Sequence, residues 1–180
     1  MNYTARGGEL QGNRKWGERR GELVARIRFS YNRFMRIYLD VCSLQRPLDD
    51  RSQPRVNVEA EAVLTILEMV ESGHLELLSS EALVLEIDRT PNSDRKASVR
   101  EILELANETI EFGDEIEEHA DSLIKAGIKP MDALHVASAS WAKADFFCTC
   151  DDKLLKKCKK LKSLAVAVVS PLQLIAEVTP

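Results

Sequence analysis

Acidic residues stand at the ends of apolar segments in this sequence. Asp40 closes the segment RIYLD, and Asp151 lies two residues past the segment DFFCT. If both segments are strands of a parallel sheet, the two acids share one edge, because ligand sites form outside the carboxyl ends of such strands. Asp132 lies in the first turn of the helix predicted before DFFCT, and Glu86 lies on an earlier predicted helix. Both are expected to reach the same edge.

Four carboxylates at one edge would repel one another and lose solvation, at a cost of several kcal/mol. Such an arrangement is stable only if a cation neutralises it. Carboxylate oxygens, with no His or Cys among them, favour Mg²⁺ or Mn²⁺ over zinc. An ion of this kind beside a phosphodiester lowers the pKa of a bound water and stabilises the charge that builds up on the phosphate oxygens. The acids therefore predict metal-dependent phosphodiester hydrolysis.

Each acid also has a purely structural interpretation. Asp40 could cap a loop, and Asp151 could be the N-cap of the helix that follows it. Asp132 could complement the dipole of its helix, a contribution of about 0.3–1 kcal/mol. Glu86 could be one of many solvated surface glutamates. The functional prediction therefore depends on all four acids lying together.

Short apolar runs alternate with amphipathic segments from residue 35 onward, a pattern typical of a parallel sheet covered by helices. The predicted fold is one doubly wound α/β domain. The last apolar run, LAVAVV, is expected to be a strand covered on both faces. The predicted strands are 36–40, 75–78, 145–149 and 164–169, and the predicted helices are 56–70, a segment capped by Ser80, 93–106, 114–126, 131–144, one beginning at Asp151 and one opening at Pro171.

A chain of 180 residues with 44% apolar content suits one domain with a real core. Residues 1–34 differ from the rest, since they hold eight basic and three acidic residues (+5), whereas residues 35–180 hold 17 basic and 26 acidic residues (−9). We expect 35–180 to be the domain and 1–34 to be a basic extension. This extension is interpreted as an appended start outside the native domain, as an arm that touches nucleic acid, or as a segment similar to an organelle transit peptide.

No apolar stretch approaches the roughly 18 residues that a membrane span needs. The start of the sequence also lacks the pattern of a secretory signal. We therefore expect a soluble, cytoplasmic protein that does not bind membranes. Its four cysteines, Cys42, Cys148, Cys150 and Cys158, are expected to be reduced and to serve as small buried apolar residues, because neither their spacing nor the scattered histidines suits a zinc site.

Four segments carry a family resemblance in their order and spacing: IYLDVCS, SSEALVLEI, PMDALHVASA and FFCTCDDKLL. The most specific part is DALH in a predicted buried helix, followed by an aromatic strand and TxD. Together the segments resemble the PIN-domain nucleases, the family that includes the VapC toxins of bacterial toxin-antitoxin pairs. The resemblance covers about residues 35–174.

The resemblance implies a three-layer α/β/α PIN-like fold with a mostly parallel central sheet, and a hydrolase that uses one or two Mg²⁺ or Mn²⁺ ions. Its expected activity is endoribonuclease cleavage of structured or single-stranded RNA, leaving a 3′-hydroxyl and a 5′-phosphate. The family's acids fall on Asp40, Glu86, Asp132 and Asp151, which are the expected catalytic and metal-binding residues. Asp152 replaces the last of these if the register slips by one.

Ser43 and Thr149 fall on the small polar positions that accompany the first and fourth acids of the family. They are predicted substrate contacts, together with Arg46 and with Lys153 of the run KLLKKCKKLK. The lysines matter because a domain of charge −9 repels RNA outside its metal site. Each of these basic residues could equally be a solvated surface residue.

A toxin would imply a small antitoxin laid across the acidic edge, and a homodimer. The loop RPLDDRSQP is longer and more charged than in many family members, so its two aspartates could crowd the site or mark another substrate. A different class of function is a PIN-like module that binds RNA or a protein without cutting. A phospho-accepting receiver domain is the third hypothesis, but it needs a pair of acids after its first strand, where Asp40 stands alone.

Overall fold

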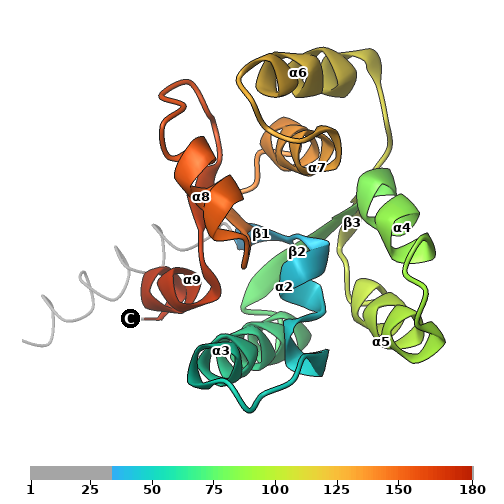
Figure 1. The fold of residues 1–180 in the computed structure, drawn as a ribbon, viewed down its shortest axis with the longest axis vertical. Helices are drawn as coiled ribbons and strands as arrows, with labels where there is room; N and C mark the ends of the chain where they lie inside the picture. Colours follow the sequence, from blue (N-terminus) through green and yellow to red (C-terminus); the bar gives the residue numbers. More distant parts are fainter. Residues whose placement is uncertain (1–33, 180) are drawn as a thin grey trace, which may run out of the picture. The chain divides into compact units, whose positions relative to one another are not determined.

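The computed structural model describes residues 34–179. The predictions for residues 1–34 therefore lie outside the described residues, except at Phe34. One sheet of parallel strands, in the order β3-β2-β1-β4-β5, runs through the described part of the chain (Figure 1). Its strands are β1 (Met35–Leu39), β2 (Leu75–Ser80), β3 (Glu108–Ile110), β4 (Phe146–Cys148) and β5 (Ala167–Val169).

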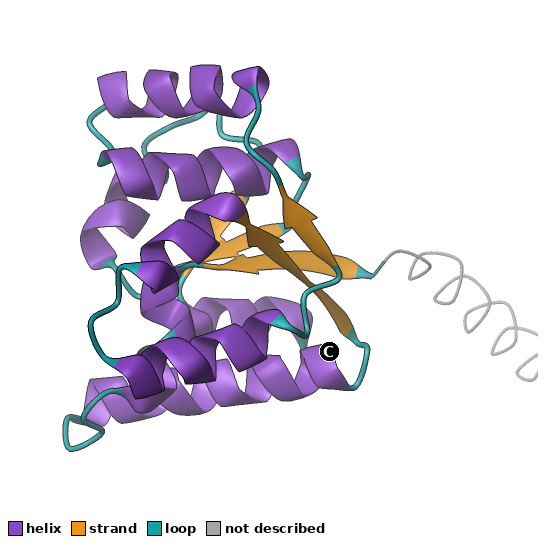
Figure 2. Cartoon of the chain, turned by 90° about the vertical axis from the view of Figure 1, so that its right-hand side faces the viewer, coloured by secondary structure: helices purple, strands orange, loops and turns teal. Residues whose placement is uncertain are grey.

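Helices cover both faces of this sheet, so the fold has three α/β/α layers (Figure 2). Helices α3 and α9 pack together on one face, and α7 covers the other with α6 outside it. The helical segments are α2 (Val41–Leu44), the 3₁₀ helix η1 (Arg46–Leu48), α3 (Pro54–Glu71), α4 (Glu81–Asp88), α5 (Ser93–Leu103), α6 (Asp114–Lys125), α7 (Pro130–Trp141), α8 (Asp152–Cys158) and α9 (Pro171–Val178). The predicted three-layer fold with a parallel sheet is confirmed.

Helix boundaries follow local chemistry. Proline occupies the first turn of α3, α7 and α9, where its missing N–H costs no hydrogen bond. The hydroxyl of Ser80 caps α4 by accepting a bond from the N–H of Leu83 at 3.3 Å, as predicted. Among the described residues, no helix is long and apolar enough to cross a membrane.

The two edge strands depart from prediction. β3 was not predicted, because Glu108 and Thr109 are exposed and only Ile110 is buried, which leaves no apolar run to mark it. The segment 164–169 was predicted to be one strand covered on both faces, but only Ala167–Val169 pairs with β4. That prediction was wrong because β5 lies at the edge of the sheet, where Ala167 is exposed.

The central strand β1 forms the middle of the core. Ile37, Tyr38 and Leu39 are all fully buried, and β1 pairs with β2 on one side and β4 on the other. The chain thus leaves β1 in one direction and returns beside it in the other, which makes the carboxyl ends of β1 and β4 a topological switch point, the usual position of a ligand site. Receiver domains of the flavodoxin-like class have the order 2-1-3-4-5 instead, so the receiver hypothesis does not fit this sheet.

Candidate active site

Asp40 follows β1 directly and caps helix α2. Its Oδ1 accepts a hydrogen bond from the N–H of Ser43 at 2.9 Å, and the thiol of Cys42 lies 3.0 and 3.1 Å from its two oxygens. The residue is only 6% exposed. Burial raises the pKa of Asp40, while hydrogen bonds from Thr149, Cys42 and Ser43 act in the opposite direction. The capping role predicted as an alternative is thus real, but it leaves a buried acid that costs free energy when ionised.

Asp151 lies at the matching position after β4 and caps helix α8. Its Oδ1 accepts bonds from the N–H groups of Lys153 at 2.7 Å and Leu154 at 3.3 Å. Its own N–H donates to Oγ1 of Thr149 at 3.0 Å. Capping therefore uses Oδ1, while Oδ2 of Asp151 faces the ammonium of Lys129 at 3.9 Å.

Asp132 completes a group of three acids that come from different parts of the chain. It lies in the first turn of α7, and its Oδ2 is 4.0 Å from the same Lys129 ammonium that faces Asp151. Burial raises the pKa of Asp132, the charge of Lys129 opposes this, and the negative charges of Asp151 and Asp40 raise it further. Asp132 therefore lies close enough to both Asp40 and Asp151 to be repelled by them, with one cation between Asp132 and Asp151.

Glu86 approaches this group through His135. Its Oε2 lies 2.6 Å from Nε2 of His135 on α7, and its side chain is 40% exposed. Both Glu86 and Asp40 raise the pKa of the buried Tyr38, whose hydroxyl bonds to the other ring nitrogen of His135. Helix α4 therefore presents the fourth predicted acid on the same side of the sheet as α7.

The four acids suit a hard divalent cation by charge and by donor type. Repelling carboxylates supply only oxygen ligands, and an ammonium already lies between two of them. Within residues 34–179, no three His, Cys, Asp or Glu side chains are arranged to hold a metal ion as they stand. An ion at this edge would therefore have to replace the Lys129 ammonium and draw the carboxylates toward itself.

The predicted substrate contacts divide into buried and exposed residues. Ser43 is 0% exposed and Thr149 is 1% exposed. Ser43 Oγ donates to the carbonyl of Cys148 at 3.2 Å, while Thr149 accepts the bond from Asp151. Both hydroxyls are therefore used inside the protein, and the role of the two residues as substrate contacts stays a prediction. Lys153 is exposed at the start of α8 and stays a predicted contact.

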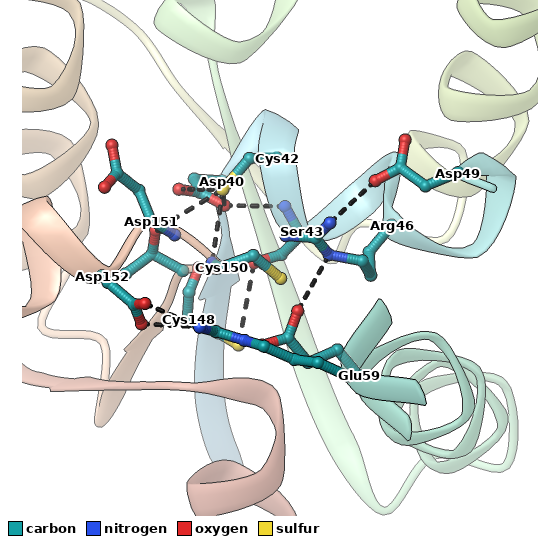
Figure 3. A network of polar contacts seen from close by, with 12 residues as sticks. Asp40, Cys42, Ser43, Arg46, Asp49, Glu59, Cys148, Cys150, Asp151 and Asp152 are labelled. Carbon is teal, nitrogen blue, oxygen red and sulfur yellow. Dashed lines mark hydrogen bonds and ion pairs between the residues drawn. The ribbon is translucent and has the colours of Figure 1, made fainter. Parts of the chain in front are cut away.

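A network of ion pairs lies beside Asp40 (Figure 3). Arg46 pairs with Asp49 at 2.9 Å and with Glu59 at 3.1 Å, and its side chain is only 18% exposed. The contact to Glu59 is an ion pair without an aligned hydrogen bond. Arg95 joins the network from α5 by a 2.9 Å bond to Asp49. The charged loop after Asp40 is thus held against α3 and α5.

Glu59 is the important residue here that was not predicted. It is 3% exposed and also accepts a 2.8 Å bond from Arg55, four residues before it on α3. A signal existed in the sequence, because Glu59 falls beside Ala60 on the face of this helix that the apolar pattern predicts to be buried. Arg55 in turn donates two 2.7 Å bonds to Asp152, which lower the pKa of that exposed acid. Asp152 is therefore an ion-pair partner of Arg55, and the assignment of Asp151 to the site stays a prediction.

The free cysteines agree with the prediction in three of four cases. Cys148, Cys150 and Cys158 are buried, whereas Cys42 is partly exposed beside Asp40. Burial raises the pKa of Cys148 and raises that of Cys158 to about 11, so these thiols are protonated at neutral pH.

A cavity of about 650 Å³ lies away from the acids, at the β3 edge of the sheet. It is lined by residues 108–116 and Trp141, and none of the four predicted acids lines it. The candidate site is therefore the acidic edge at the switch point, which is defined by charge and topology.

The fold and the acids define an α/β/α protein with a carboxylate site where β1 and β4 end. The model of the PIN domain family matches residues 37–160, and the chain therefore belongs to the PIN domain family. No curated protein matches the chain.

Two solved structures share this fold. One is a chain of "VapBC2 from Rickettsia felis bound to a DNA fragment from their promoter", with a TM-score of 0.53, 15% identity, and coverage of 76% of this chain and 98% of that chain. The other is PAE2754 from Pyrobaculum aerophilum, with a TM-score of 0.50, 16% identity, and coverage of 80% of this chain and 96% of that chain. At these identities the likeness concerns the fold.

Proposed function

We propose that this protein is a Mg²⁺- or Mn²⁺-dependent endoribonuclease that hydrolyses RNA phosphodiesters. The observation that carries this proposal is the Lys129 ammonium, 4.0 Å from Asp132 and 3.9 Å from Asp151, with Asp40 near enough to raise the pKa of Asp132. Two carboxylates from separate segments converge around one positive charge, and a third lies near enough to act on one of them. Membership of the PIN domain family supports the assignment of this site to a nuclease.

Asp40, Asp132 and Asp151 would hold the ion, and Glu86 would complete its ligands or orient the attacking water. The bound ion would activate that water and neutralise charge on the scissile phosphate. Asp40 is the most constrained of the ligands, because its Oδ1 is fixed by the N–H of Ser43. Asp151 is fixed in the same way by the first turn of α8. These caps fix Oδ1 of Asp40 and of Asp151, so the adjustment that metal binding requires would fall on the other carboxylate oxygens.

An antitoxin partner and a homodimer belong to the same proposal. The likeness to VapBC2 bound to a DNA fragment from their promoter supports a toxin of a toxin-antitoxin pair. A partner that inactivates this protein would have to cover the acidic edge. A basic side chain inserted between the carboxylates, in the position that Lys129 takes here, would compete with the metal ion.

The test is cleavage of RNA by the purified chain with Mg²⁺, with Mn²⁺, and with a chelator. We expect cleavage only with a metal ion, and a loss of about 100-fold or more in Asp132→Asn, because a neutral amide is a much weaker ligand. Asp40→Asn should behave alike. Asp121→Asn, an exposed acid on α6, is the matched control and should cleave like the wild type. Equal cleavage by wild type and Asp132→Asn would exclude the proposal.

The non-catalytic module is the competing function. Calorimetric titration with Mn²⁺ separates the two, because a nuclease should show a saturable site that Asp132→Ala removes. A module that binds RNA or protein without cutting should bind no metal at this edge and should be unaffected by the substitution.

A further inference from the structure

A continuous chain of hydrogen bonds connects the core to Glu86. The hydroxyl of Ser80 lies 2.6 Å from that of Tyr38, which lies 2.8 Å from Nδ1 of His135, and Nε2 of His135 lies 2.6 Å from Oε2 of Glu86. Tyr38 and Ser80 are fully buried and His135 is 2% exposed. These hydrogen bonds link β2, β1, α7 and α4. The last of them reaches Glu86, one of the four acids of the candidate site.

The direction of each proton in this chain follows from its two ends. The carboxylate of Glu86 can only accept, so it accepts a hydrogen bond from Nε2 of His135, and an imidazole with one ring proton then accepts at Nδ1. Tyr38 then donates to Nδ1. Having used its proton, the tyrosine oxygen accepts from Ser80, whose oxygen also accepts the N–H of Leu83. Every polar atom of the chain is satisfied, and all the protons point toward Glu86.

Tyr38 is suited to hold the ring in this state. Its hydroxyl is fully buried and lies within hydrogen-bond distance of both Ser80 and His135, so it can donate to one while it accepts from the other. The tyrosine ring also stacks on Phe147 of β4, with centroids 5.5 Å apart. The tyrosine hydroxyl is therefore fixed by the rigid centre of the sheet. Its bond to Nδ1 leaves Nε2 of His135 to bond to Glu86.

Glu86 needs such a partner more than Asp40 and Asp151 do. Asp40 and Asp151 are each fixed by backbone N–H groups of their own helix turns. Glu86 has a longer, 40% exposed side chain, and within residues 34–179 the bond from His135 is the hydrogen bond that holds its carboxylate. We propose that His135 is a positioning residue, kept by Tyr38 and Ser80 in the tautomer that donates from Nε2, and that it holds Glu86 at the metal edge.

This inference rests on the proposed function for its consequence, and metal affinity is its first test. Mn²⁺ binding should weaken about 10- to 100-fold in His135→Leu, because groups that orient metal ligands have effects of this size. Tyr38→Phe should weaken it in the same direction. His135→Gln should recover affinity to within about threefold of wild type, since its amide can accept from Tyr38 and donate to Glu86. If all three variants bound Mn²⁺ with the affinity of the wild type, the positioning role would be overturned.

Folding and the proposed function are separated from this role by two controls. The melting temperature of each variant is measured to show that it folds. If a substitution at His135 prevents folding, Tyr38→Phe still tests the proposal, because it retains the packed ring. Asp132→Asn should abolish Mn²⁺ binding whether or not His135 positions Glu86. If Mn²⁺ binding were lost in Asp132→Asn but unchanged in the His135 and Tyr38 variants, the metal site would stand and the positioning role of His135 would be refuted.

The tautomer gives a second test that needs no metal. Long-range nitrogen NMR of the imidazole of His135 in the metal-free protein should show a protonated Nε2 and an unprotonated Nδ1, and His135→Gln identifies this signal among the three histidines. Tyr38→Phe should reduce the preference for this tautomer. A proton on Nδ1, alone or together with Nε2, would overturn the inference even if the wild type bound no metal.

Discussion

Asp40 combines a structural and a chemical role that conflict energetically. Its carboxylate caps α2, which stabilises the fold, but burial raises its pKa. The folded protein then binds a proton more tightly than the unfolded chain does. Stability should therefore fall as pH rises from the ordinary aspartate value toward the raised pKa, and the full cost persists above it.

We expect Asp40→Asn to stabilise the metal-free protein at neutral pH. Asparagine is as good an N-cap as aspartate and carries no charge, so the free energy of unfolding should rise by about 1 kcal/mol, or roughly 2–4 °C in Tm for a chain of this size. The gain should disappear below the pKa of an ordinary aspartate, where the wild-type carboxyl is protonated in both states. Thermal unfolding across pH, with a chelator present, measures both effects.

Asp121→Asn is the control for this stability measurement. It removes the same charge from an exposed site on α6, and its effect should stay within about 0.5 kcal/mol at every pH. Addition of Mn²⁺ should stabilise the wild type and not Asp40→Asn. A lower Tm for Asp40→Asn at neutral pH would show that the cap, and not the buried charge, dominates at this residue.

At the residue scale, the sequence predicted which acids lie at the ends of β1 and β4 but not their hydrogen-bond partners. Asp40 and Asp151 were predictable because each directly follows an apolar run at the edge of a parallel sheet. The bond between Glu86 and His135 could not be predicted, because 49 residues separate them and the packing of α4 on α7 brings them together. The burial of Ser43 and Thr149 could not be predicted either, because burial depends on tertiary contacts.

At the element scale, the connection between α6 and α7 places Asp132. Gly127 ends α6 with a φ of 92°, a conformation that side chains with a Cβ adopt at a cost. Its N–H donates to the carbonyl of Ile124 at 2.8 Å, and the N–H of Ile128 donates to that of Leu123 at 3.1 Å. This glycine turn directs the chain back across the sheet, so that α7 begins beside Lys129 and its first turn carries Asp132 to the acidic edge.

Gly127→Ala should therefore lower the free energy of unfolding by about 1–2 kcal/mol. No atom lies within 4 Å of a Cβ at this position, so the cost comes from the backbone and not from a clash. Gly127→Asn is the matched control, because asparagine adopts positive φ more readily and should lose less stability. Denaturant unfolding measures both, and an alanine variant as stable as the asparagine variant would contradict this account.

The long, periodic elements were predictable and the short edge strands were not. Helices α3, α6 and α7 matched their predicted ranges within a few residues, because apolar spacing, proline and glycine all marked the same boundaries. β3 depends on backbone pairing with β2. Only one of its three residues is buried, so it has little apolar character of its own. Edge strands of this kind are defined by the neighbouring strand and have little sequence signal of their own.

At the scale of the whole molecule, the distribution of charge decides how RNA would approach. Residues 35–180 carry a net charge of −9, so long-range forces oppose a polyanion. Helix α8 is the exception, because its lysines are exposed just after Asp151. One of them, Lys157, is engaged within the protein by donating to the carbonyl of Gly127, and Lys159, just after α8, donates to Gln173 at 3.3 Å. Lys153, in the first turn of α8, is the lysine nearest in sequence to the acids.

We expect Lys153→Gln to weaken RNA binding without changing Mn²⁺ affinity. Binding of a labelled single-stranded RNA is measured by fluorescence anisotropy in an Asp132→Asn background, which prevents cleavage, from ~50 to ~200 mM KCl. Loss of one phosphate contact should reduce the slope of log affinity against log salt by about 0.7. Lys125→Gln on α6 removes the same charge elsewhere and should leave the slope unchanged. Equal slopes in the two variants would mean that general charge, and not a local contact at α8, governs the attraction between this acidic domain and RNA.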